Sequence, residues 1–120
     1  MHFRGYAPDL PRLLAALDLY VSPARAEAFG LATVEAMLCG ACVVATDTDG
    51  SREIVEDGVT GRVVPVGAVE ALAGAVTELL ADADRRAAMG AAARAAAYAR
   101  FGLARMVDAT EQVYREALAT

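Results

Sequence analysis

The sequence contains no tryptophan, no lysine and a single histidine, and aromatic residues make up only 6% of its 120 positions. Its only cysteines are Cys39 and Cys42. A zinc ion with four Cys or His ligands therefore cannot be held within one chain. We interpret both cysteines as small apolar side chains in a reducing compartment. The alternative, a redox pair, would need a helix to begin at Cys39, and the local pattern instead places a helix end there.

Positive charge is also scarce. The 11 basic residues are all arginine, and 16 acidic residues give a formal net charge of -5. This balance argues against a protein that binds nucleic acid by neutralising its phosphates. No uncharged run approaches the roughly 20 apolar residues of a membrane span, and the first residues lack the apolar stretch of a signal peptide. We therefore expect a cytoplasmic chain with no nucleic-acid partner and no membrane span.

Small apolar residues are abundant. Hydrophobic residues make up 57% of the chain, and 29 of them are alanine. A domain of this size can bury about two-thirds of the surface that the unfolded chain exposes. The sequence thus predicts one domain, residues 1–120, with a core of valine and leucine.

Short apolar runs alternate with helical patterns in the first half of the chain. Residues 19–21, 42–45 and 62–66 are too short for helices and are typical of buried parallel strands. Between the first two runs, apolar residues recur at helical spacing, and Gly40 lies where a helix-ending glycine belongs. Residues 18–46 therefore form a predicted strand–helix–strand unit. Residues 2–6 could add a further strand.

The second half is helical almost throughout. An apolar stripe over residues 69–80, an Ala- and Arg-rich stretch over 82–100 and an amphipathic stretch over 103–118 each predict a helix. A short helix is also expected around Leu13, Leu14 and Leu17. The predicted fold class is α/β, with a parallel sheet of three to four strands and a helical C-terminal tail.

Residues 27–35 lie where the first strand of this unit ends and its helix begins. Ligands of open α/β sheets bind at that edge, and Gly30 would let an anion approach the free N–H groups of the helix. An ordinary loop entry remains the alternative. Glu35 has no arginine partner on its own helix, so it either stabilises the helix N-terminus or accepts hydrogen bonds from ribose hydroxyls. Glu27 either faces the same cleft or pairs with Arg25.

A longer pattern extends these features across nearly the whole chain. It comprises Asp18-Leu19-Tyr20-Val21-Ser22-Pro23, Glu27-Ala28-Phe29-Gly30-Leu31, Glu35-Ala36-Met37, Cys39-Gly40, Val43-Val44-Ala45-Thr46, Asp49-Gly50, Glu53-Ile54-Val55, Asp57-Gly58 and Thr60-Gly61. This pattern closely resembles the group 1, or family 4, glycosyltransferases, with their two glutamates separated by seven residues (the EX7E motif). The later residues Leu72, Leu79, Leu80, Phe101, Val113, Tyr114 and Arg115 resemble the C-terminal helices of that family.

The resemblance implies a retaining transferase that moves a hexosyl group from a nucleotide-sugar to an acceptor, in a cleft between two Rossmann-like domains. The chain would correspond to part of the C-terminal, donor-binding domain of this GT-B architecture. By position, Glu27 would bind the donor sugar and take the catalytic position, and Glu35 would bind the ribose. The backbone of Phe29, Gly30, Leu31 and Ala32 would meet the sugar and the diphosphate. No metal or other cofactor is implied.

The family's N-terminal domain and the first strands of its donor domain have no counterpart in these residues. We therefore expect the chain alone to be inactive, with the other domain as its partner if that domain is encoded separately. A non-catalytic nucleotide-sugar-binding or assembly module is the alternative. The first strand of the unit would also have an open edge. Either residues 2–6 cover that edge or two chains pair there as a homodimer.

Overall fold

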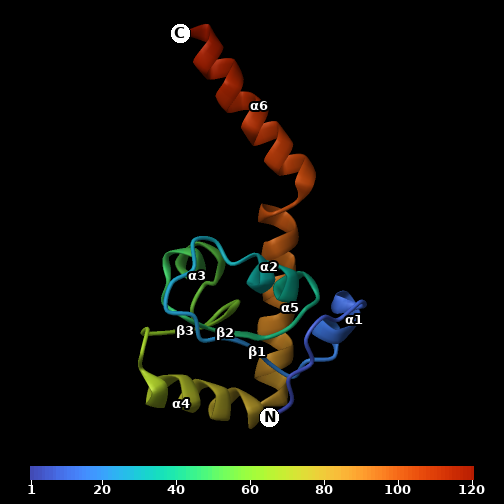
Figure 1. Cartoon of the computed structure of the whole chain (residues 1–120), viewed down its shortest axis with the longest axis vertical. Helices are drawn as coiled ribbons and strands as arrows, with labels where there is room; N and C mark the ends of the chain where they lie inside the picture. Colours follow the sequence, from blue (N-terminus) through green and yellow to red (C-terminus); the bar gives the residue numbers. More distant parts are fainter.

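Three short parallel strands form the centre of the molecule, with helices on both faces of the sheet, in the computed structural model of residues 1–120 (Figure 1). The elements in chain order are α1 (Leu10–Ala15), β1 (Tyr20–Ser22), α2 (Leu31–Leu38), β2 (Val43–Thr46), α3 (Asp49–Ile54), β3 (Gly61–Val64), α4 (Val69–Leu80), α5 (Ala83–Arg100) and α6 (Leu103–Ala119). The α/β prediction with a helical C-terminal tail is confirmed.

The strands lie in the order β1-β2-β3, and both neighbouring pairs are parallel. Val43 of β2 lies opposite Tyr20 on one side and Gly61 on the other. At Gly61 a β-carbon would stand 2.6 Å from the carbonyl oxygen of Val43, so this position admits only glycine. The three predicted apolar runs are these strands, with boundaries moved by one or two residues.

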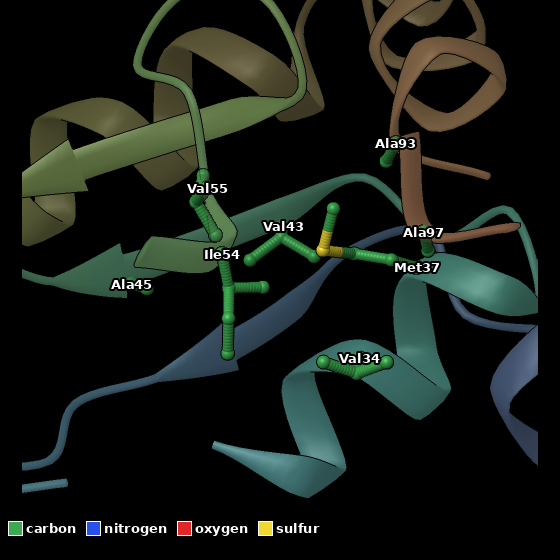
Figure 2. Close-up of a cluster of buried hydrophobic side chains, with 8 residues drawn as sticks. All are labelled: Val34, Met37, Val43, Ala45, Ile54, Val55, Ala93 and Ala97. Atoms are coloured by element: carbon green, nitrogen blue, oxygen red, sulfur yellow. The ribbon is translucent and has the colours of Figure 1, made fainter. Parts of the chain in front are cut away.

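Strand β2 is the buried centre of the sheet, and its side chains alternate between two clusters. Val43 and Ala45 point to one face, where they meet α2, the end of α3 and α5. The cluster on this face is drawn in Figure 2 and consists of Val34, Met37, Val43, Ala45, Ile54, Val55, Ala93 and Ala97. The alanines of α5 let that helix lie close to the sheet, which gives the Ala-rich stretch a packing role.

The opposite face is covered chiefly by α4. Cys42 and Val44 join side chains of β3, α4 and α5 in a second cluster, which contains Val64, Ala75, Leu79 and Met89. Helix α5 thus contributes to the cores on both faces. A third, smaller cluster joins Leu14 of α1 to Ala36 of α2 and to Ala41. Burial also raises the pKa of the Cys42 thiol, as expected for a structural cysteine.

Two glycines with left-handed backbone bracket α2. Gly30 precedes the helix with φ +102°, and Gly40 follows it with φ +79°. Residues with a β-carbon rarely adopt these angles, so glycine fixes where the helix starts and stops. The sequence prediction of a helix end at Cys39 and Gly40 is confirmed.

The prediction for residues 2–6 was wrong. This segment has no regular structure, and β1 has no partner on its outer side. Phe3 and Tyr6 are 92% and 91% exposed rather than folded against the sheet. Gly5 has φ +61°, a left-handed conformation that interrupts an extended strand.

Helix α3 was not predicted. Thr48 caps it, because its hydroxyl accepts a hydrogen bond from the amide of Ser51 at 3.2 Å. The helix has only six residues and no repeated apolar stripe, so its sequence lacked the periodic signal that identified the longer helices. The first turn of α3 contacts the loop that follows β1.

Helix α6 projects away from the rest of the molecule and carries the C-terminus to its far end (Figure 1). None of its residues is buried. It accounts for the elongated shape, in which the longest dimension is 54 Å and the other two are close to 30 Å.

Candidate functional site

The loop between β1 and α2 crosses the carboxyl edge of the sheet, the edge at which ligands of parallel α/β folds bind. Its beginning is fixed by Thr46, the last residue of β2. The Thr46 hydroxyl lies 3.3 Å from the carbonyl oxygen of Ser22 and 2.5 Å from that of Ala24. The buried hydroxyl therefore joins the loop to the neighbouring strand.

The end of the loop is fixed by Gly50 in the first turn of α3. Its amide donates a hydrogen bond to the carbonyl oxygen of Glu27 at 2.9 Å. A β-carbon at this position would lie 2.2 Å from the carbonyl oxygen of Phe29. Only glycine allows α3 to approach the loop backbone this closely.

The first turn of α2 has free amides. The carbonyl of Gly30 accepts hydrogen bonds from the amides of Thr33 and Val34, at 3.0 and 3.1 Å. The amides of Leu31 and Ala32 have no acceptor, and both residues are exposed. An exposed helix N-terminus with free N–H groups is suited to receive an anion. Gly30 therefore precedes a helix whose first two amides are free, and its role in binding an anion stays a prediction.

Glu27 lies beside this helix start. Its γ-carbon is 3.5 Å from the point where a β-carbon of Gly30 would stand, so its side chain borders the first turn. It lines a depression of about 390 Å³ together with Arg25, Ala26, Ala28, Asp47, Thr48 and Asp49. The ion pair between Glu27 and Arg25 that the sequence left open does not form, because neither side chain makes a salt bridge.

Arg52 stands at the border of the same region. Its guanidinium contacts Asp47 at 2.7 Å and Asp49 at 3.3 Å, which lie on the preceding loop and the first turn of α3. The hydrogen bond and the charge of Asp47 raise the pKa of Arg52 further above its usual value.

Glu35 lies in the second turn of α2, four residues beyond Leu31 and about 6 Å further along the helix axis. The first turn holds no acidic residue, so Glu35 does not act as a cap at the helix N-terminus. It is half-buried and makes no salt bridge. It lines a separate depression of about 310 Å³, whose other residues are Leu10, Pro11, Leu14, Leu38 and Cys39.

The structure therefore brings Glu27, Phe29, Gly30, Leu31 and Ala32 together at the start of α2 and places Glu35 one turn beyond them. The two glutamates line different depressions. A compact ligand would not touch both. An extended ligand could do so, with an anionic centre at the free amides and a hydroxyl-bearing group at each end.

No three carboxylate, imidazole or thiol groups are arranged to hold a metal ion. No helix is both long enough and apolar enough to span a bilayer. Cys39 and Cys42 are both free thiols.

Three residues that shape the loop were given no role from the sequence: Thr46, Gly50 and Phe101. Thr46 and Gly50 belonged to the pattern quoted above, but their contacts with the loop depend on neighbours more than 20 residues away. Phe101 packs edge-on against Phe29, and no periodicity or local motif indicates that contact.

Fold and site together define a parallel α/β domain whose second helix starts with free amides at the carboxyl edge of the sheet. The chain belongs to the group 1 glycosyl transferases, a family whose profile matches residues 1–96. It is 38% identical over 116 residues to the lipopolysaccharide core mannosyltransferase LpcC of Rhizobium leguminosarum bv. viciae, covering 97% of this chain and 33% of that protein. It is 40% identical over 111 residues to the D-inositol 3-phosphate glycosyltransferase of Thermobispora bispora, covering 92% of this chain and 26% of that protein.

Solved structures show a similarity to the same family. HepE of Anabaena, in complex with UDP-glucose, superposes with a TM-score of 0.81 at 36% identity, over 98% of this chain and 32% of HepE. Sucrose-phosphate synthase of Thermosynechococcus elongatus gives a TM-score of 0.83 at 33% identity, over 89% of this chain and 27% of that enzyme. The fold matches part of the GT-B glycosyltransferase structures. The chain spans about a third of the length of the relatives it matches.

Proposed function

We propose that this chain is the donor-binding part of a retaining glycosyltransferase and binds a nucleotide-sugar across the start of α2. The observation that carries this proposal is the pair of free amides at Leu31 and Ala32, with an unpaired carboxylate on either side of them. HepE, a relative with the same fold, has been solved with UDP-glucose. That ligand class has the required order of groups: a sugar, a diphosphate and a ribose.

In this arrangement the diphosphate is received by the backbone of Phe29, Gly30, Leu31 and Ala32. The donor sugar lies toward Glu27, whose carboxylate accepts hydrogen bonds from sugar hydroxyls and stabilises positive charge that develops near the anomeric carbon. The ribose lies toward Glu35. Backbone amides, rather than a metal ion, stabilise the charge of the leaving diphosphate.

The whole enzyme needs more than these residues. The chain spans between a quarter and a third of its relatives' length, so we propose that a further domain supplies the acceptor site and completes the cleft. The exposed outer edge of β1 is a second place where a partner is expected. It would be covered by further strands of the whole protein or, in a homodimer, by a second copy of this chain.

Saturation-transfer NMR with UDP-, GDP- and ADP-sugars tests the proposal. At least one of them should bind the chain, and the transfer should be strongest at ribose and sugar protons. Glu35→Ala should weaken that binding by about tenfold, since it removes charge-assisted hydrogen bonds to the ribose. Glu70→Ala, on the exposed surface of α4, is the matched control and should leave binding unchanged.

Two results would contradict the proposal: binding of none of these ligands, or equal binding by the Glu35→Ala variant. Transfer activity separates the enzyme from the non-catalytic alternative. Activity is expected when the rest of a relative is supplied as a second chain, and it should survive chelation of divalent metals. Binding without any transfer would favour a binding or assembly module instead.

A further inference from the structure

Phe29 contributes its backbone to the proposed donor site, but its side chain points to another part of the molecule. The residue is 40% exposed, and its ring packs against Phe101. The ring centroids are 5.7 Å apart and the planes meet at 81°, the edge-to-face geometry that aromatic pairs favour. Through this ring contact, the loop between β1 and α2 packs against a residue 72 positions later in the chain, just beyond the end of α5.

Phe101 makes contacts with α5 and with the core that fix its own position. It ends α5, and its amide donates a hydrogen bond to the carbonyl of Ala97 at 2.9 Å. Ala97 is fully buried in the core against the sheet. The guanidinium of Arg100 lies 4.8 Å from the centroid of the Phe101 ring and also donates to the carbonyl of Glu53 at the end of α3. The ring that Phe29 contacts thus packs against the core cluster on this face of the sheet.

The other side of Phe29 is bounded by Gly50. The Gly50 α-carbon lies against the Phe29 carbonyl, and its amide holds the Glu27 carbonyl. Phe29 is therefore confined between α3 on its backbone side and the end of α5 on its ring side. These two contacts determine where the Phe29 backbone lies relative to the free amides of Leu31 and Ala32.

We propose that Phe101 is a positioning residue of the donor site, which holds the Phe29 backbone in place for the diphosphate through the edge-to-face contact of the two rings. This inference rests on the proposed function for its ligand, a nucleoside diphosphate. Phe101 itself does not touch that ligand. Glu35 lies on the far side of the first turn of α2, so Phe101 affects the diphosphate subsite and leaves the ribose subsite unchanged.

A binding experiment can show whether Phe101 positions the diphosphate subsite or only contributes to the stability of the fold. UDP and GDP are compared with uridine and guanosine, which carry the same ribose but no diphosphate. Phe101→Ala should weaken binding of the diphosphate by about fivefold, the size expected for loss of an aromatic pair. The affinity for the matching nucleoside should stay within about twofold. An equal loss for both ligands, or no loss for either, would overturn the inference.

Two further variants control for stability. Phe101→Leu keeps most of the apolar volume but removes the ring edge, so it should show the same selective loss with a smaller change in unfolding temperature. Tyr98→Ala removes an exposed ring one turn earlier on α5, whose contact is with Arg94 and not with the loop. This variant should bind UDP and GDP as the original chain does.

Hydrogen exchange tests the same inference without any ligand. The Gly50 amide is bonded to Glu27, and the amides of Thr33 and Val34 are bonded to Gly30, so all three report on the position of the loop. In Phe101→Ala they should exchange severalfold faster, while amides of β2 keep their rates. Unchanged exchange at all three would overturn the positioning role. If neither UDP nor GDP binds the original chain but exchange responds as expected, the assignment of the ligand fails and the positioning of the loop stands.

Discussion

The α/β body, residues 10–101, and helix α6 are both well-formed, but they use their apolar residues differently. In the body, Met37, Val43, Val44 and Leu79 are completely buried. In α6 the large apolar side chains remain between 43% and 86% exposed; they are Leu103, Met106, Val107, Val113, Tyr114 and Leu118. An amphipathic pattern predicts that a helix forms, but it does not predict what covers its apolar face.

The largest difference in stability between the two regions is expected when one leucine in each is replaced by alanine. Leu79→Ala should lower the free energy of unfolding by about 2–5 kcal/mol, because it leaves a cavity between α4 and the sheet. Leu118→Ala should change it by less than about 0.5 kcal/mol, because the side chain is exposed. Chemical denaturation of both variants measures this. A large loss in Leu118→Ala would mean that α6 packs against the body or a second chain in solution.

Two glycines extend the test to helices within the body. In α5, a β-carbon at Gly90 would lie 2.2 Å from the carbonyl oxygen of Gly40. Gly90→Ala should therefore cost about 1–3 kcal/mol, since α5 must move away from the turn at Gly40 that follows α2. In α4, Gly74 has nothing within 4 Å of that position. Gly74→Ala should raise stability by up to about 1 kcal/mol, through helix propensity alone. Thermal unfolding of the Gly90→Ala and Gly74→Ala variants measures this difference. Equal changes in stability would contradict the close packing of α5.

Removing α6 altogether gives a more direct comparison. A chain that ends at Gly102 should unfold with nearly the same free energy, within about 1 kcal/mol, because α6 contributes no buried residue. Its far-ultraviolet circular dichroism should lose signal in proportion to the helix removed. Loss of cooperative unfolding in the shortened chain would show that the body depends on α6.

The smallest expected effect concerns charge pairs. Glu78 on α4 contacts Arg62 of β3 and Arg85 of α5, and the hydrogen bond and charge of Arg85 lower its pKa. A lowered pKa in the folded state stabilises the fold above the unfolded value of about 4.3 and loses that contribution as the pH falls through the folded value. Glu78→Gln should therefore unfold at a slightly lower temperature at pH 7, and the two curves should converge below about pH 4.

Glu111→Gln is the control for that prediction. Its partner, Arg115, lies on the same exposed helix, so the pair connects no separate elements. This variant should show a smaller difference at pH 7. A pH-independent difference for Glu78→Gln would contradict the role of its charge.

The sequence predicted most of the body because local signals were strong there. Apolar runs marked β2 and β3, helical spacing marked α2 and α4, and Gly40 marked a helix end. Residues 2–6 were assigned wrongly because apolar content alone did not reveal the left-handed backbone at Gly5. The sequence placed Glu27, Gly30 and Glu35 around the start of a helix, as the structure shows, and their binding roles stay predictions. The contacts that hold the loop, from Thr46, Gly50 and Phe101, could not be predicted, because they join residues distant in sequence.

The central claim is that the start of α2 receives a diphosphate. The most direct test is a titration of the isotope-labelled chain with UDP-glucose and GDP-mannose, followed through the backbone amide resonances. Our account predicts that Gly30, Leu31 and Ala32 show the largest shifts with at least one of the two, and that the outer half of α6, residues 112–119, shows none. Shifts confined to other elements, or none at saturating ligand, would contradict it.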